Sequence, residues 1–288
     1  MQNLLSELPT PIELLLDPLS LYVLGSYAFL ILWEEIFAAR KLPKVKFWRI
    51  KGLLFFFSFF YVASYLPIFI DPFLAKFQLM DLTHLGLITS LLIGLVVFEL
   101  VIYAYHFTMH KYNFLWRTFH QVHHSAERMD AYGALFHSPL DIIGFTLVGS
   151  VSFALLIGLS PQSITVLLFV INFLSFFQHA NIKTPRWIGF FIQRPESHSV
   201  HHGRGIHKYN YADLPLIDMI FGTFKNPKNY EKETGFYDGA SIRIKDMFLF
   251  RDVSKPKKKM ININRTNKLI VKNLIKNGLY KKNISYKI

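Results

Sequence analysis

Five long apolar stretches, almost free of formal charge, constrain the fold of this 288-residue chain more than any other feature. They are Leu19–Trp33, Leu53–Ile70, Leu85–Tyr105, Ile142–Leu159 and Pro161–Gln178. A helix needs about 20 residues to cross the hydrocarbon core of a bilayer. Buried helices of a soluble protein are also apolar, but five such runs and a mean hydropathy of +0.28 favour a membrane protein. The sequence predicts an all-α polytopic membrane protein with about four to five membrane-embedded helices.

Three details of these stretches bear on the fold. The first stretch is short and can continue past Glu34 and Glu35. The third contains Glu99, which must face protein or a polar cavity because a carboxylate in hydrocarbon is costly. Only Ser160 lies between the last two stretches, and the second of them begins with the helix breaker Pro161. These two stretches therefore predict a helical hairpin.

The basic residues predict the orientation of the chain. If the N-terminus lies outside, 31 of the 32 Lys and Arg residues face the cytoplasm and only Lys76 faces outward, as the positive-inside tendency requires. The net charge of +13 is concentrated toward the C-terminus and accompanies no nucleic-acid-binding motif, so a nucleic-acid partner is not expected. We therefore expect a multi-pass protein with its histidine-rich segments and C-terminus in the cytoplasm.

We expect the chain to have three parts. Residues 1–84 are expected to form N-terminal membrane helices, residues 85–225 a catalytic domain, and residues 226–288 a basic cytoplasmic tail. The Lys/Asn/Ile-rich end of the tail fits a solvated extension. A helix on an anionic lipid surface is the alternative, because Leu269, Ile270, Leu274 and Ile275 recur near helical spacing among lysines.

The chain has no cysteine, so a metal ion would have to be bound by nitrogen or oxygen atoms, and histidine is the obvious ligand. Of its 12 histidines, 11 follow the third or the fifth stretch and so reach the same predicted face; His84 alone lies opposite, where an interfacial role is expected. Most belong to three groups: His106 and His110 ("HFTMH"); His120, His123 and His124 ("HQVHH"); His198, His201 and His202 ("HSVHH"). Histidines three or four residues apart share a helical face, so each group is expected to present its rings on one side.

These eight histidines exceed the roughly four to six ligands of one ion, and they are the expected catalytic residues of a dinuclear metal site. His137 ("FHSPLD") and His179 ("FQHAN") are further candidate ligands. The expected metal ligands are His106, His110, His120, His123, His124, His137, His179, His198, His201 and His202. Acidic side chains nearby could orient the rings or form caps and ion pairs instead; they are Glu127, Asp130, Asp141, Asp213 and Asp218.

The order of the histidine groups, each next to an apolar stretch, resembles the fatty acid hydroxylase superfamily, which includes sterol desaturases. The connecting segments "FLWRTFHQVHHSAERMD", "FQHANIKTPRW" and "SHSVHHGRGIHKYNYADLPLIDMIFGTF" resemble it too, and the resemblance covers about residues 90–225. It implies two iron ions held by nine of the ten histidines, and leaves His137 less defined because Ser138 intervenes before Pro139. It also implies that Arg117, Arg204, Asn210 and Asp213 brace the site, that Trp116 and Tyr209 pack, and that His207 supports the site, faces substrate or is structural.

The resemblance implies a membrane-bound non-haem di-iron oxidoreductase that uses O2 to hydroxylate or desaturate a C–H bond of a lipid, such as a sterol or a fatty acyl chain. A separate ferredoxin, cytochrome or reductase is expected to supply the electrons. Two alternatives stay open. A zinc-dependent lipid enzyme could use the same scaffold, although H-E-x-x-H is absent. A histidine-rich membrane protein could bind or transport metal, although the stretches carry histidine only at their ends.

Overall fold

Five long helices form the body of the protein, as the apolar stretches predict. The computed structural model describes residues 8–256. The long helices are α3 (Pro18–Ile36), α4 (Trp48–Leu74), α5 (Leu87–Lys111), α8 (Pro139–Ser150) and α9 (Pro161–His179). The 3₁₀ turn η1 (Ala75–Phe77) extends α4, and the π-helical segment η4 (Val151–Leu156) extends α8. In the described part of the chain, five helical segments are long and apolar enough to span a membrane, which confirms the upper end of the expected number.

The outer faces of these helices are apolar. Leu32, Leu54, Ile88 and Leu92 are all more than 60% exposed, on four different turns of three helices. A soluble monomer rarely exposes so many large apolar side chains. A membrane-facing belt around the helices accounts for it.

Local capping explains where the first helices begin. Thr10 and Glu13 form a reciprocal capping box at the start of α2 (Pro11–Leu16), and the Asp17 carboxylate caps α3. Helix α3 continues through Glu34 and Glu35, as expected for the short first stretch. Buried Glu34 accepts hydrogen bonds from the backbone N–H groups of two loops, at Ala131 and Asn181.

Glu99 faces protein, as its position in an apolar stretch requires. Its Oε2 accepts a 2.9 Å hydrogen bond from the backbone N–H of Leu214, next to α11 (Pro215–Ile220). The carboxyl therefore joins the middle of α5 to the segment that follows the last histidine group.

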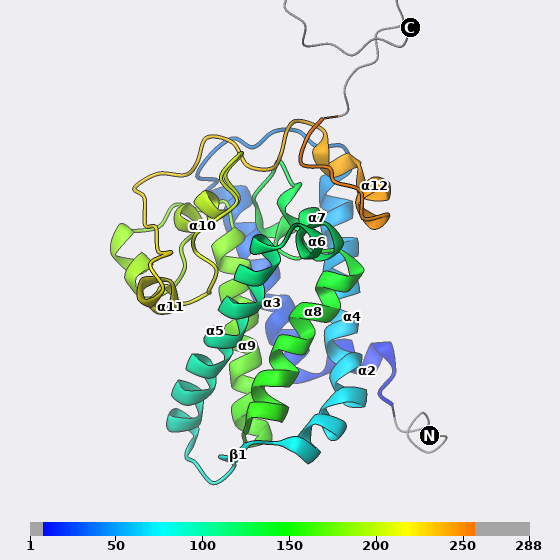
Figure 1. The fold of residues 1–288 in the computed structure, drawn as a ribbon, viewed down its shortest axis with the longest axis vertical. Coiled ribbons are helices and arrows are strands. Elements are labelled where there is room, and N and C mark those ends of the chain that lie inside the picture. Colours follow the sequence, from blue (N-terminus) through cyan, green and yellow to red (C-terminus); the bar gives the residue numbers. More distant parts are fainter. Residues whose placement is uncertain (1–7, 257–288) are drawn as a thin grey trace, which may run out of the picture. The chain divides into compact units, whose positions relative to one another are not determined.

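A two-residue parallel strand pair departs from the all-helical expectation. Strand β1 (Met80–Asp81) pairs with β2 (Ile157–Gly158) at the end of the helices opposite the short helices α6, α7 and α10 (Figure 1). The pair joins the connection before α5 to the turn between α8 and α9. Exposed His84 lies in the same connection, away from the other histidines, as predicted.

Short helices and turns form a cap over the other end of the long helices (Figure 1). They are α6 (Asn113–Leu115), the π-helical η2 (Trp116–His120), α7 (Gln121–His124), the 3₁₀ turns η3 (Ala131–Gly133), η5 (Arg186–Phe190) and η6 (Ala240–Ile242), and the helices α10 (Pro195–His201), α11 and α12 (Ile244–Phe248). The cap joins α5 to α8 and continues after α9. The segments that carry 11 histidines therefore meet at one end, as the predicted number of crossings requires.

Residues 226–254 pack into the cap. Met247 and Val253 are buried with Trp48, Val122 and Phe136, and the Val253 N–H donates to Gln121 Oε1. One compact unit extends to Ser254, so the tail expected from residue 226 begins inside it. The three-part division of the chain stays a prediction. The alternative surface helix near residues 269–275 lies outside the described residues.

Candidate metal centre

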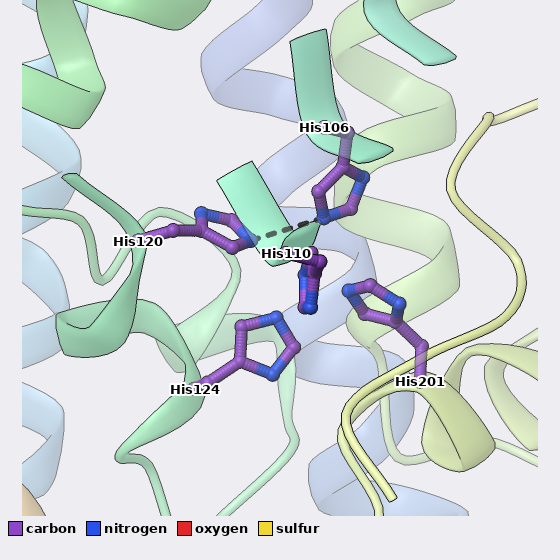
Figure 2. Close-up of side chains that lie close together, drawn as sticks. All are labelled: His106, His110, His120, His124 and His201. Carbon is purple, nitrogen blue, oxygen red and sulfur yellow. Dashed lines mark hydrogen bonds between the residues drawn. The ribbon is translucent and has the colours of Figure 1, made fainter. Parts of the chain in front are cut away.

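Nine histidines converge in two groups beneath the cap. The first group is His106, His110, His120, His124 and His201, and the second is His123, His179, His198 and His202. Within each group, the facing ring nitrogens all lie within 4.8 Å of one another. Figure 2 shows the rings of the first group turned toward a common centre from three separate segments of the chain.

Each H-x-x-H-H motif divides its rings between the two groups. His120 and His124 enter the first group while His123 enters the second, and α10 does the reverse, since His201 enters the first group. Residues i and i+4 point in similar directions on a helix, whereas neighbouring residues point about 100° apart. The expectation that each histidine group presents all its rings on one side was therefore wrong for the two H-x-x-H-H motifs, whereas His106 and His110 both enter the first group.

Backbone carbonyls fix the proton positions on three rings of the first group. The Nδ1–H groups of His106, His110 and His201 donate to the carbonyl oxygens of Tyr211, His207 and Tyr209, at 2.8, 2.9 and 2.7 Å. A carbonyl can only accept, so Nδ1 carries the proton in each neutral ring. The Nε2 lone pairs of these rings therefore point inward.

Asp141 orients the fourth ring and accounts for His137. Its Oδ2 accepts 2.8 Å hydrogen bonds from Nδ1 of both His120 and His137, and its Oδ1 accepts one from the Tyr105 hydroxyl. His137 also stacks on His123, with ring centroids 4.1 Å apart. His137 thus lies outside both groups, and with His120 and Asp141 it forms a third set of possible ligand atoms that lie within 4.8 Å of one another.

In the second group a backbone carbonyl holds one ring, whereas Nδ1 of His123 and His198 is buried without a hydrogen-bond partner in the described structure. His179 donates from Nδ1 to the Ser175 carbonyl at 2.7 Å, which leaves its Nε2 as an acceptor. This nitrogen lies 3.1 Å from Nε2 of both His123 and His198. Nε2 of His202 lies 3.2 Å from the same atom of His198. Four nitrogens therefore crowd one small space.

The nitrogen arrangement fits two transition-metal ions. Two nitrogens bound at right angles to an ion about 2.1 Å away lie about 3.0 Å apart, close to these separations. In the described chain, Nε2 of His110, His124 and His201 is buried without a hydrogen-bond partner. Lone pairs that converge without a donor repel one another unless a cation lies between them, and imidazole suits iron, zinc, copper or nickel.

Burial keeps these rings in the form that binds metal. The pKa values of His123, His124, His198, His201 and His202 lie well below the ordinary value, because burial disfavours the charged imidazolium and neighbouring histidines add repulsion. Burial also lowers the pKa of His207 to about 4. These six histidines are therefore neutral at physiological pH.

Asp141 alone among the five acidic candidates is hydrogen-bonded to histidine rings in the described structure. The other four contact the backbone or other side chains. Glu127 accepts from the Ser241 N–H, Asp130 from Trp48 Nε1, Asp213 from Gln178 Nε2, and Asp218 from the N–H groups of Tyr211 and Ala212. Their contacts hold together the loops that carry the site.

The expected bracing residues differ in what they contact. The Arg117 Nε donates to the Asn113 carbonyl, and Arg204 pairs with Glu233 and Asp238 at the surface. Asn210 instead ties the Ser197 carbonyl of α10 to the Lys225 carbonyl. The Trp116 ring packs on His110 and His124, with centroids 4.9 and 5.0 Å away, as predicted for a packing aromatic.

The 207–211 loop has a role that the residue types did not reveal. Its carbonyls accept from three rings of the first group, and Nδ1 of His207 lies 3.1 Å from Nδ1 of His124. Positive φ angles of 43°, 73° and 51° at His207, Tyr209 and Asn210 turn these groups toward the site. Such angles are unfavourable for residues other than glycine and cluster at functional sites. The one sequence signal was Asn210, a residue that tolerates this conformation.

An apolar cavity of about 460 Å³ adjoins both groups. It lies between α4, α5, α8 and α9 and reaches His106, His120, His123, His179 and His198. Its walls are mostly aromatic and aliphatic, and include Phe59, Phe98, Ile102, Phe145 and Phe153. A long apolar molecule in this cavity would touch the histidines at one end.

The comparison with known proteins matches the segment that builds the site. The fatty acid hydroxylase family matches residues 91–223, which include all nine grouped histidines. Sphinganine C4-monooxygenases 2 and 1 of Arabidopsis thaliana are 28% identical over 167 residues and 26% identical over 155 residues. These alignments cover 53% and 52% of this chain and 61% and 59% of the relatives.

A third relative acts on a different lipid. Cholesterol 25-hydroxylase of Rattus norvegicus is 30% identical over 149 residues, 48% of each chain. The chain thus spans about half to three fifths of the length of these curated relatives. No solved structure matches. The histidine-bearing segment, residues 91–223, thus belongs to the fatty acid hydroxylase superfamily.

Proposed function

We propose that this protein is a membrane-bound non-haem di-iron oxygenase that hydroxylates or desaturates a C–H bond of a lipid. One observation carries the proposal: two groups of inward-facing imidazole nitrogens lie at the end of an apolar cavity. The nitrogens provide a place for two metal ions. The cavity provides a place for a hydrocarbon beside them.

The proposed iron ligands are His106, His110, His120, His124 and His201 for one ion and His123, His179, His198 and His202 for the other. Bound iron would supply the activation of O2 and the oxidation of the C–H bond. Asp141 would hold His120 in the tautomer that presents Nε2 to the metal. His137, which sequence analysis includes among the ligands, would act through its hydrogen bond to Asp141.

The cavity would position the lipid and exclude water. Its aromatic and aliphatic walls favour a hydrocarbon chain over a polar substrate. Exclusion of water matters here, because an oxidant strong enough for an unactivated C–H bond would also consume electrons unproductively if exposed.

The printed names of the relatives support a lipid substrate. Two are monooxygenases named for sphinganine and one is a hydroxylase named for cholesterol. From these names we apply to this protein only the reaction class that they share, the insertion of oxygen into a lipid. Desaturation is the second outcome of the same proposal, since loss of a second hydrogen can replace transfer of the hydroxyl.

The proposed reaction needs an electron donor. Hydroxylation consumes one O2, two electrons and two protons, and yields the alcohol and one water. We propose that a separate ferredoxin, cytochrome or reductase supplies the electrons from the cytoplasm. This places the cap, with its histidines, on the cytoplasmic side, in agreement with the distribution of basic residues.

Metal analysis and labelled oxygen test the function. The protein is purified from cells grown with iron, its metals are counted, and lipids from cells with and without the gene are compared after exposure to isotopically labelled dioxygen. We expect about two iron ions per chain and a lipid carrying labelled oxygen or a new double bond. Native zinc with turnover under argon would favour the zinc enzyme, and metal flux with unchanged lipids would favour a transporter; either result refutes the proposal.

A further inference from the structure

The cavity has a second polar end, remote from the histidines. Five of the six residues in and just beyond α4 that line it recur every four positions: Phe59, Ala63, Pro67, Asp71 and Ala75; Pro72 is the sixth. This spacing makes a single stripe along the helix. Asp71 is the only charged residue in the stripe, and it lies near the end of α4 that leads to β1.

Two polar atoms at this end, on neighbouring side chains, have no hydrogen-bond partner other than each other in the described structure. Ser150, on α8, lies beside Asp71 and lines the same cavity. The contact between the two side chains falls short of hydrogen-bond geometry. In the described structure, Asp71 Oδ1 and Ser150 Oγ are buried without another hydrogen-bond partner. A buried polar atom left in this state costs free energy, which a ligand that donates a hydrogen bond can recover.

The chemistry of this end selects among lipid head groups. Asp71 offers acceptors, and no Lys or Arg is among the described side chains that line the cavity. A hydroxyl or an ammonium group therefore fits, whereas a carboxylate or a phosphate would face an unneutralised carboxyl. Gln78 and Thr83 line the same end and add polar atoms for a hydroxylated head.

The distance between the two ends sets where oxidation occurs. Ser150 and Asp141 are nine residues apart on α8, or about 14 Å at 1.5 Å per residue, and Asp141 holds the His120 and His137 rings. This length is close to half of the roughly 30 Å hydrocarbon core of a bilayer. A chain anchored at Asp71 would thus reach the histidines with carbons far from its head.

We propose that Asp71 and Ser150 bind the hydroxyl or ammonium head of a long-chain lipid, so that the metal centre oxidises its chain at a carbon remote from the head. The proposal rests on the proposed function for the oxidation step, but the binding step is independent of it. Gln178 is the competing polar contact, because its Oε1 is unpartnered at the histidine end. A head bound there would instead be oxidised at a neighbouring carbon.

Binding of simple probes tests the head-group site. Thermal stabilisation of the full-length protein in detergent is measured with hexadecanol, hexadecylamine, hexadecanoate and the matched hydrocarbon hexadecane. We expect the alcohol and the amine to bind about tenfold more tightly than hexadecane and the carboxylate to bind no better. In Asp71→Leu this preference should disappear while hexadecane binding persists, which also shows that the variant folds.

Matched variants separate charge from shape. Asp71→Asn keeps an acceptor and should weaken the amine more than the alcohol, and Ser150→Ala should weaken the alcohol. Asp238→Asn is the control, because Asp238 is an exposed carboxyl that does not line the cavity. Equal binding of all four probes to the wild type, or an unchanged preference in Asp71→Leu, would overturn the proposal.

The position of oxidation distinguishes this proposal from the proposed function. Oxygen incorporated into the distal half of a bound alcohol supports both. Incorporation next to the hydroxyl keeps the oxygenase and refutes the Asp71 site. A head-group preference that depends on Asp71, without any oxygen-dependent product, keeps the site and refutes the oxygenase.

Discussion

His106 Nε2 and His120 Nε2 face each other 3.0 Å apart, while Nδ1 of each ring is held by an oxygen acceptor. His106 donates from Nδ1 to the Tyr211 carbonyl, and His120 donates from Nδ1 to the Asp141 carboxylate. Two lone pairs at this distance repel in the metal-free protein. Because the surrounding acceptors already fix both tautomers, a cation between the rings would meet ligands that need little reorganisation.

Removal of one ligand from each group should have unequal effects on metal content. His123→Ala leaves three histidines in the second group, whereas His201→Ala leaves four in the first. We expect His123→Ala to retain about one ion per chain and His201→Ala to hold its ion more weakly, with turnover reduced at least about 100-fold in both. Metal counting and product analysis check this. His84→Ala, an exposed control at the opposite end, should match the wild type. Full metal and normal turnover in both site variants would contradict the assignment.

Asp141→Asn should weaken metal binding without removing a ligand. The amide keeps the size of the side chain, but it cannot accept from His120, His137 and Tyr105 as the carboxylate does. We expect a loss of about 10- to 100-fold in metal affinity, measured by competition with a chelator. Asp238→Asn, at an exposed surface ion pair, is the control. Unchanged affinity in Asp141→Asn would show that His120 does not need this partner.

The sequence predicted the helices and the histidines better than it predicted how the rings are divided. Apolar length and the number of crossings suffice to bring His106 and His198 to one end of the bundle. The division of His120, His123 and His124 between two groups depends on helical rotation within a short π-helical and α-helical turn. The role of the backbone carbonyls of residues 207–211 could not be predicted from the sequence. It depends on a positive φ at Tyr209, a conformation that tyrosine disfavours and that tertiary contacts impose.

Gly144→Ala should disturb the contact between Tyr105 and Asp141. A methyl group at this position would lie 2.0 Å from the Tyr105 hydroxyl oxygen and 2.7 Å from its ring carbon Cζ, so the tyrosine would have to move. We expect a destabilisation of about 1–3 kcal/mol with weaker metal binding, measured by thermal unfolding and chelator competition. Gly149→Ala, on the same helix, has open space around the added methyl and should be neutral or stabilising. Equal effects of the two substitutions would argue against this crowding.

Acid should destabilise the metal-free protein before the metal-loaded one. The pKa values of His123, His124, His201 and His202 are lowered by burial in the folded state, while an unfolded histidine titrates near pH 6.5. The unfolded state therefore takes up more protons below this pH, and stability falls as the pH drops toward about 4, the pKa of His207. Thermal unfolding from about pH 7.5 to about pH 5 checks the sign. A metal-free midpoint that stays constant or rises over this range would contradict it.

Single cysteines can determine which side of the membrane holds the metal centre, because the chain has no cysteine of its own. Exposed His84 and Lys232 lie at opposite ends of the helices, one beside β1 and the other in the chain that follows the last histidine group. If the cap is cytoplasmic, a membrane-impermeant maleimide applied to intact cells should label His84→Cys and should label Lys232→Cys only after permeabilisation. Leu92→Cys, on the apolar outer face of α5, should resist labelling in both conditions because its thiol would lie in lipid. The reverse labelling pattern for His84→Cys and Lys232→Cys would contradict a cytoplasmic cap. It would put 31 of the 32 basic residues outside the cell, and the metal centre would then be inaccessible to a cytoplasmic electron donor.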